Sequence, residues 1–230
     1  ARAMTQCPCS LVGYTFVDDT DLVHTADDPN SSAQEIMDTM QNAVDHWNGL
    51  LSATGGAIEP SKSFIYIIDF CWTSQKWRYK TRDEAPGDIT ICIPHTGQEE
   101  KLTRLELAEA RRTLGIMMSM DGGQTQQEEF LFTKAAEFAD YVQTSTLDKN
   151  NTRHALNTVS MHIIEYLMAA ISLSEKQWAH ITSPIMTQVL PKTGMARSFP
   201  HAVLYTPLKY QGRGLMKPYL NNYIQQIYTL

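Results

Sequence analysis

The stretch that decides the fold is Gly13-Tyr14-Thr15-Phe16-Val17-Asp18-Asp19-Thr20-Asp21-Leu22-Val23, in which acidic residues separate two short apolar runs. Aromatic and β-branched residues on both sides favour extended strands, and the Asp-rich centre favours a turn between them. We therefore predict a β-hairpin with its carboxylates at the turn. Because adjacent carboxylates repel each other, we expect a cation to bind between them. The simpler interpretation is an acidic turn whose side chains only solvate the backbone.

A helix is predicted directly after this hairpin. Ser32 and Glu35 have the spacing of a capping box, and apolar residues then recur at three- and four-residue steps until Gly55-Gly56 ends the pattern. Lys62 lies in the following turn, where a lysine is ordinarily a solvated surface residue. The β-branched and aromatic run over residues 64–70 predicts a buried strand.

Residues 72–82 alternate aromatic and basic side chains. This alternation fits a stacking platform for nucleic acid, and it fits better a hairpin with one packed and one wet face. Another short strand is expected over residues 89–93. The segment 102–123 is mixed, and its end predicts a strand followed by an Asp-Gly turn.

The pattern becomes helical from Thr125 onward. Apolar spacing predicts one helix over residues 130–142, a second after residues 150–152, and a third that Ser174 begins. Pro184 is expected to kink or divide the third helix, because proline lacks the backbone N–H that the helix needs. The predicted order of elements, with strands and one helix in the first half of the chain and only helices in the second, indicates an α+β protein.

Charge is distributed unevenly along the chain. Residues 1–150 carry 12 Lys and Arg against 23 Asp and Glu, whereas residues 151–230 carry 7 against 2. The tail over residues 190–230 contains no Asp or Glu and interleaves cations with aromatic residues, which indicates either a surface for a polyanion or a solvated basic face. The predicted nucleic-acid-binding residues are Lys192, Arg197, Lys209, Arg213 and Lys217.

The spacing of the cysteine and histidine residues does not match a metal-binding motif. The 4 cysteines lack a second pair at zinc-site spacing, and the 7 histidines do not cluster. No apolar run approaches the length that spans a bilayer, and no charged-then-apolar leader is recognisable. We therefore expect an intracellular protein, nuclear or cytoplasmic, with no membrane partner.

Three ordered features carry a resemblance to a known family. Phe16-Val17-Asp18-Asp19 resembles the aromatic-x-Asp-Asp motif of the reverse transcriptase palm, Lys62 stands where that family has a lysine after a glycine-containing turn, and Leu114-Gly115-Ile116 resembles the strand that closes the palm. In this order they resemble reverse transcriptases (RNA-directed DNA polymerases) of non-long-terminal-repeat, LINE-like retrotransposons. The resemblance implies a partial palm over residues 1–123, an antiparallel sheet with a packed helix, and a helical thumb-like region with a basic tail over residues 124–230.

The resemblance also implies a chemistry. Two-metal nucleotidyl transfer needs carboxylate oxygens for Mg²⁺ (or Mn²⁺), a role that falls to Asp18 and Asp19, and a cation near the leaving pyrophosphate, a role that falls to Lys62. Asp21 is expected to be structural. The implied partners are an RNA template, a DNA primer and deoxynucleoside triphosphates.

Such polymerases take a further metal-binding Asp and their fingers from sequence before the aspartate pair. We therefore expect these parts in a preceding segment of the same polyprotein, and an isolated chain that is inactive as a polymerase. Two alternatives stay open. One is a non-catalytic nucleic-acid or protein-binding module derived from a degenerate retroelement. The other is a two-metal nuclease, which needs further acidic or His ligands that no spacing singles out.

Overall fold

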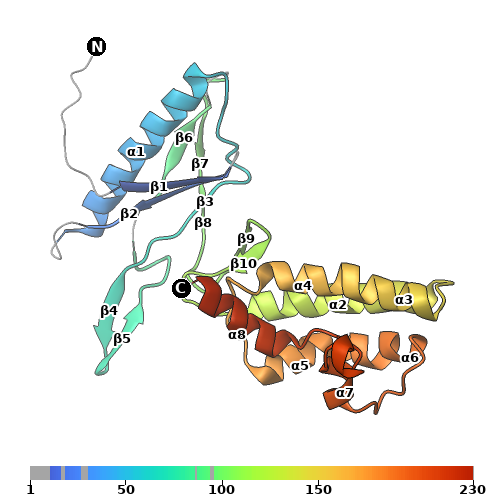
Figure 1. The fold of residues 1–230 in the computed structure, drawn as a ribbon. Helices are drawn as coiled ribbons and strands as arrows, with labels where there is room; N and C mark the ends of the chain where they lie inside the picture. Colours follow the sequence, from blue (N-terminus) through green and yellow to red (C-terminus); the bar gives the residue numbers. More distant parts are fainter. Residues whose placement is uncertain (1–10, 17–18, 27–30, 86, 94–95, 230) are drawn as a thin grey trace. The chain divides into compact units, whose positions relative to one another are not determined.

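The computed structural model describes residues 11–16, 19–26, 31–85, 87–93 and 96–229. The chain divides into two compact units, Ala1–Glu109 and Ala110–Leu230 (Figure 1). The first unit combines short strands with one long helix and the second is mainly helical, so the α+β class is confirmed. The division comes earlier than residue 123, the boundary that the resemblance implies.

The strands of the first unit are short and pair two by two. In chain order they are β1 (Leu11–Phe16), β2 (Asp19–His24), β3 (Phe64–Ile65), β4 (Phe70–Thr73), β5 (Lys76–Tyr79), β6 (Thr90–Cys92), β7 (Glu99–Lys101) and β8 (Thr103–Arg104). The antiparallel pairs are β1–β2, β4–β5 and β6–β7, whereas β3 and β8 run parallel. In the described ranges these strands form separate ribbons rather than the continuous sheet that a palm implies.

Helix α1 (Ala33–Ala53) begins at the predicted capping box. The Ser32 hydroxyl accepts a hydrogen bond from the Glu35 amide at 3.2 Å, and the Glu35 carboxylate accepts one from the Ser32 amide at 3.0 Å. At the other end Gly55 has a φ of 86°, and the Gly56 amide donates to the Leu51 carbonyl at 2.8 Å. Local sequence therefore sets both ends of this helix.

The core of the first unit lies between α1 and β6. Its buried side chains are Met37, Val44, Ile89 and Ile91, and Leu22 of the β1–β2 hairpin packs against them. Side-chain amides of α1 also bind backbone groups of β6. Gln41 both donates to the Thr90 carbonyl, at 2.8 Å, and accepts from the Thr90 amide, at 2.9 Å, and Asn48 donates to the Cys92 carbonyl at 2.7 Å. Apolar contact and these bonds together fix α1 on the strand.

The run over residues 64–70 is not one buried strand. Only Phe64 and Ile65 are paired, and their parallel partner β8 is itself two residues long, so the ladder cannot continue. The chain then leaves extended pairing until β4 begins at Phe70, and the residues between are half-buried or exposed. Apolar composition alone did not reveal how short the partner strand is.

The second unit begins with a hairpin and continues as helices. Its elements are β9 (Arg111–Thr113), β10 (Ile116–Met118), α2 (Thr125–Thr144), α3 (Lys149–Ala155), α4 (Met161–Leu167), α5 (Glu175–Pro184), α6 (Leu190–Lys192), α7 (His201–Tyr205) and α8 (Pro218–Thr229). π-helical turns occupy Leu156–Ser160 and Ile185–Val189, and a 3₁₀ turn occupies Leu208–Tyr210. No helix in the described ranges is both long and apolar enough to cross a membrane.

Helix α5 runs along α2, and α8 contacts α4 and α5 (Figure 1). Leu131, Ala135, Ala139 and Val142 line one side of α2 and are buried against Trp178, Ile181, Ile185 and Val189. The predicted start of α5 is confirmed, because Ser174 caps it through the amide and side chain of Gln177. Pro184 ends α5 and a wider π-helical turn follows, as its missing N–H leads one to expect.

The β9–β10 hairpin is bound to the start of α2. The side-chain oxygen of Gln127, which is buried, accepts from the Met117 amide at 2.6 Å, and that of Gln126 accepts from the Ala110 amide at 2.5 Å. Leu114 and Gly115, expected in a strand, instead form the turn between the strands, with φ of 50° and 88°. Positive φ at both positions is the geometry that a two-residue hairpin turn requires.

Candidate functional site

The β1–β2 hairpin positions the acidic residues that the sequence singled out. Antiparallel pairing runs from Leu11 opposite His24 to Phe16 opposite Asp19, so the strands meet at the aromatic-acid motif. Asp18 lies outside the described residues. The hairpin itself is confirmed, but the prediction that its carboxylates lie at the turn is wrong for Asp19 and Asp21, which are paired residues of β2.

Alternation along β2 separates a core side from a solvent side. Thr20, Leu22 and His24 are half-buried, whereas Asp19 and Asp21 are exposed. Because successive strand residues point to opposite faces, the two carboxylates share one face. Asp21, which is expected to be structural, lies on the same solvent face as Asp19; its backbone pairs with Tyr14 of β1, whereas its carboxylate makes no hydrogen bond with a described residue.

This face offers some of the oxygen ligands that a hard cation needs. Mg²⁺ is commonly held by one or two carboxylates, and waters and substrate phosphates complete its octahedron. On this face Asp19, one of the two predicted metal ligands, supplies a donor of that kind. In the described ranges no group of three or more His, Cys, Asp or Glu side chains could enclose a metal ion.

Lys62 lies in an exposed turn before β3. Its amide donates to the Glu59 carbonyl at 3.1 Å, and its ammonium makes no hydrogen bond or ion pair with a described residue. The pKa of Glu59 is lowered mainly by the Ser61 hydroxyl, with a smaller contribution from the charge of Lys62. Within the described ranges, no hydrogen bond or ion pair joins Lys62 to Asp19.

Lys192 of the basic tail has a structural role. Its ammonium donates to the carbonyls of Val142 and Ser145 at 2.6 Å and to that of Gln143 at 3.2 Å. These carbonyls lie at the C-terminus of α2, where a cation is favoured by the helix dipole and by otherwise unsatisfied acceptors. Its three protons are already used by backbone oxygens, which sets it apart from the other predicted nucleic-acid contacts.

The remaining cations of the tail are more open. Arg197, Lys209 and Arg213 are exposed, with Lys209 over the Tyr210 ring at 4.8 Å and Arg213 over the Phe199 ring at 5.9 Å. Lys217 is half-buried and pairs with Glu175 at 3.4 Å. The structure therefore leaves three of the five predicted residues with exposed charges.

Backbone hydrogen bonds hold the Gly-containing segment over residues 211–215. Its amides at Arg213 and Gly214 donate to the Val203 and Thr206 carbonyls at 2.9 and 2.8 Å. Gly212 is buried, and a Cβ there would collide with the Thr206 carbonyl oxygen. Glycine is needed for this close backbone approach rather than for mobility.

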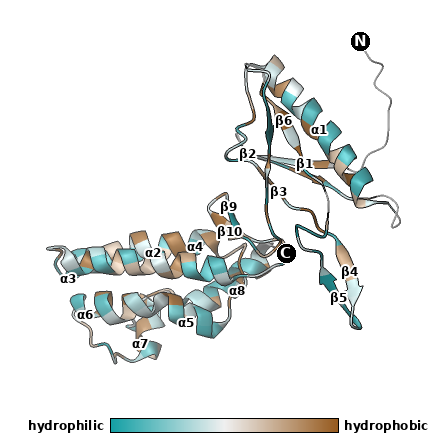
Figure 2. Ribbon diagram, turned by 180° about the vertical axis from the view of Figure 1, so that it is seen from behind, coloured by the Kyte–Doolittle hydropathy of each residue, from teal (hydrophilic) through white to brown (hydrophobic). Residues whose placement is uncertain are grey.

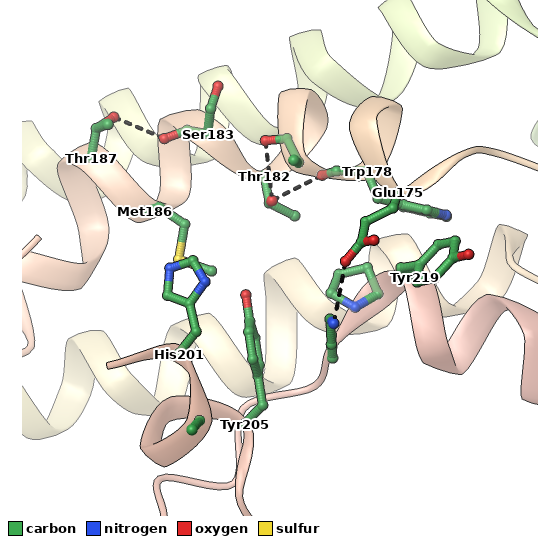
Figure 3. Close-up of a pocket in the computed structure, with 13 residues that line it drawn as sticks. Glu175, Trp178, Thr182, Ser183, Met186, Thr187, His201, Tyr205 and Tyr219 are labelled. Carbon is green, nitrogen blue, oxygen red and sulfur yellow. Dashed lines mark hydrogen bonds and ion pairs between the residues drawn. The ribbon is translucent and has the colours of Figure 1, made fainter. Parts of the chain in front are cut away.

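A pocket that sequence reasoning missed lies in the helical unit (Figure 3). It has a volume of about 540 Å³ and is formed by α5, the π-helical turn after it, α7 and the start of α8. No sequence signal could have found it, because its lining comes from segments far apart in the chain. His201 and Tyr205 stand on one side, and Glu175, which pairs with Lys217, lies on another.

The chemistry of this pocket is mainly that of a nonpolar surface. The hydroxyls of Thr182 and Thr187 donate to the carbonyls of Trp178 and Ser183, each at 2.9 Å, and so remain tied to their own helix. Burial raises the pKa of Tyr205 and keeps its phenol neutral. No hydrogen bond pairs His201 with a hydroxyl nucleophile among the lining residues, all of which are described.

Comparison of the chain with models of protein families, with curated proteins and with solved structures found no match. The roles of the site residues therefore depend on their own geometry and chemistry.

Proposed function

We propose that the chain is part of an RNA-directed DNA polymerase of the LINE-like retrotransposon type, with Asp18 and Asp19 as its metal ligands. The observation that carries this proposal is the β1–β2 hairpin, which pairs Phe16 with Asp19 and packs Leu22 against the core of the first unit. Packing of Leu22 on the core and the ladder with β1 hold Asp19 at a defined position along the chain. The order of hairpin, helix and lysine-bearing turn supports the same assignment.

The residues present fit a divalent ion that needs further ligands. Asp18 and Asp19 would hold Mg²⁺ or Mn²⁺, which lowers the pKa of the primer hydroxyl and stabilises charge on the transferring phosphate. The exposed ammonium of Lys62 can move toward the leaving pyrophosphate and supply charge or a proton there. The fingers and a further Asp would come from a preceding segment of the same polyprotein, so the chain alone is proposed to be inactive.

The proposed partners are an RNA template, a DNA primer and deoxynucleoside triphosphates, in the nucleus or the cytoplasm. Arg197, Lys209 and Arg213 are exposed cations in a tail without acidic residues, which suits binding to phosphate. Lys217 would have to leave Glu175 first, and Lys192 is already bound to α2.

Mn²⁺ binding to the chain tests the metal site. Paramagnetic broadening of amide signals should centre on β1 and β2, and Asp19→Asn should weaken binding at least about fivefold because an oxygen ligand is removed. Asp140→Asn, an exposed carboxylate on α2, is the matched control and should bind Mn²⁺ as the wild type does. Broadening spread evenly over acidic residues of both units would argue against the site.

Primer extension tests the reaction. In a protein that joins this chain to its preceding segment, Asp18→Asn and Asp19→Asn should each abolish extension. Lys62→Ala should slow it by about 100-fold or more if the lysine donates a proton. Asp21→Asn should leave the rate within a few-fold, and template-dependent synthesis by the 230-residue chain alone would contradict the proposed incompleteness.

The second candidate is a non-catalytic nucleic-acid-binding module, which the charge of the helical unit favours. Residues 110–230 carry 11 Lys and Arg against 8 Asp and Glu, whereas the whole chain has a net charge of −6. Binding to a primer–template should then be metal-independent and salt-dependent. Changing Arg197, Lys209 and Arg213 to Gln should reduce the salt slope by about one for each phosphate that is no longer neutralised, unlike Lys134→Gln on α2.

A further inference from the structure

The pocket beside α7 has an apolar base, and all of its lining residues belong to the helical unit. Trp178 and Thr182 of α5 line it and are buried, and Ala179 and Met186 add further apolar surface. Figure 2 shows apolar, brown segments on both α5 and α7. The volume of about 540 Å³ lies within the range of about 300–1,000 Å³ that is typical of small-molecule sites, so a small organic ligand with an apolar body fits.

The polar groups at this base are already used within the protein. The Trp178 indole N–H donates to the Asn222 side chain at 3.2 Å, and the Thr182 hydroxyl donates to the Trp178 carbonyl at 2.9 Å. A ligand therefore meets mainly carbon atoms on α5. Its polar group must be recognised by side chains of α7 and of the start of α8.

Helix α7 contributes two polar rings that make no hydrogen bond with a described residue. The Tyr205 ring extends from α7 toward α5 (Figure 3), and burial raises the pKa of Tyr205, so its hydroxyl is protonated and can donate at neutral pH. His201 lies next to Tyr205, with 5.7 Å between the ring centroids. Both rings are therefore able to donate a hydrogen bond to a ligand.

A loosely held cation stands at the start of α8. The Lys217 ammonium pairs with Glu175 at 3.4 Å, which is longer than the about 2.7–2.9 Å of a strong charge-assisted hydrogen bond. This is the one hydrogen bond that the ammonium makes with a described residue. Because the Glu175 side chain is 64% exposed, water can replace Lys217 as its partner when a ligand binds.

The charges around the pocket favour an anion over a cation. Glu175 is the only acidic residue of the lining, all of which is described, and the tail that supplies α7 and α8 contains no Asp or Glu. A cationic group would meet one exposed carboxylate and would be repelled by Lys217. An anionic group can accept hydrogen bonds from both Lys217 and Tyr205.

We propose that this pocket binds a small organic anion, a carboxylate with an apolar body. The carboxylate accepts from the Lys217 ammonium and the Tyr205 hydroxyl, and the apolar body packs against Ala179 and Met186. A neutral apolar ligand would leave the hydroxyl and the ammonium without an acceptor. The inference goes beyond the proposed function, because it needs neither the carboxylates of the hairpin nor a nucleic acid, and failure of Mn²⁺ to bind near Asp19 would not affect it.

Titration of the full chain with decanoate, followed through amide signals in NMR spectra, tests the inference. Decanoate should bind with a Kd of about 1 mM or lower, and the shifted signals should centre on α5, α7 and the start of α8. Decylammonium has the same apolar body and the opposite charge, and it should bind at least about fivefold more weakly. Equal binding of the two ligands would overturn the proposal.

Opposite changes of the ion pair give a second comparison. Lys217→Gln should weaken decanoate binding at least about fivefold because it removes the cationic donor, whereas Glu175→Gln should preserve the affinity or raise it about two- to fivefold because it frees the ammonium. Lys209→Gln changes an exposed cation outside the lining and should bind decanoate as the wild type does. Equal losses in Lys217→Gln and Glu175→Gln would show that the ion pair is structural and would reject the proposed contact.

Two further variants test the pocket itself. Ala179→Trp fills the space from an exposed position of α5 and should weaken decanoate binding at least about tenfold, and Tyr205→Phe, which keeps the ring, should weaken it about threefold. Ala170→Trp, at an exposed alanine outside the lining, is the matched control.

Unaltered binding by Ala179→Trp, or no binding of decanoate up to about 5 mM, would contradict the assignment of the pocket. A dimer of the chain that Ala179→Trp dissociates, without decanoate binding, would assign the pocket to a second copy and reject the proposal.

Discussion

Lys192 shows how one residue can carry a different role from the one its charge indicates. Its ammonium lies against three carbonyls that are about fifty positions earlier in the chain, at the C-terminus of α2. A basic residue in a tail without acidic residues predicts binding to phosphate. In the folded protein, however, the carbonyls at the end of α2 accept the hydrogen bonds of this ammonium.

Lys192→Met should lower the free energy of unfolding of the helical unit by about 1–3 kcal/mol, because it removes charge-assisted hydrogen bonds to the helix end. Lys209→Met is the control and should change stability by less than about 0.5 kcal/mol, since Lys209 is exposed. Urea unfolding measures both. Equal effects of the two variants would show that the hydrogen bonds to α2 add nothing to stability.

Leu114 occupies a backbone conformation that a branched apolar residue rarely adopts, with a φ of 50°. Leu114→Asn should raise the free energy of unfolding by about 0.5–1 kcal/mol, because Asn tolerates this region better than Leu. Leu114→Ala keeps the unfavourable φ and should give no such gain. A thermal shift assay on the full chain compares the three proteins, and a loss of stability in Leu114→Asn would indicate that the Leu side chain is used.

At the scale of elements, α8 is fixed by a buried amide rather than by an apolar stripe. The Asn222 side chain donates to the carbonyls of Met168 and Ile171 at 2.6 and 2.8 Å and accepts from the Trp178 indole N–H at 3.2 Å. Large apolar side chains of α8, such as Ile227, are exposed instead. Buried polar groups of this kind are costly to leave unpaired.

Asn222→Ala should destabilise the helical unit by about 3 kcal/mol, because it leaves two carbonyls and one indole N–H buried without the partner that Asn222 provides. Asn221→Ala, one position earlier and less buried, should change the unfolding free energy by less than about 0.5 kcal/mol. Chemical denaturation followed by circular dichroism compares the two variants. If the neighbouring variant were equally destabilised, helix propensity rather than the hydrogen bonds would explain the loss of stability.

At the scale of the whole molecule, the second unit has a core of its own. Its cluster of buried residues contains members from α2, α4 and α5, with Tyr219 of α8 packed against it, all within Ala110–Leu230. The β9–β10 hairpin belongs to this unit through Gln126 and Gln127. A unit with its own core is expected to fold alone.

The fragment 110–230 should therefore unfold cooperatively, and its amide spectrum should overlay that of the same residues in the full chain. The fragment 124–230, cut at the boundary that the sequence indicated, should be less stable by about 1–3 kcal/mol, because it leaves the buried Gln127 without the Met117 amide. Urea denaturation of the two fragments measures the difference. Equal stability would show that the hairpin is not part of the unit.

The sequence by itself determined features whose causes lie within a few residues. The β1–β2 hairpin, the capping boxes at Ser32 and Ser174 and the end of α5 at Pro184 follow from neighbouring side chains and from the missing N–H of proline. The exposure of Asp19 follows from strand alternation.

Only the tertiary structure decided the features that join distant residues. These are the pairing of strands into separate ribbons, the assignment of β9–β10 to the helices, the pocket beside α7 and the hydrogen bonds of Lys192 to α2. Each depends on contacts between backbone groups or apolar faces that are about 10 to 50 residues apart in the sequence. Packing of the whole unit, rather than local conformational preference, decides which of these groups come into contact.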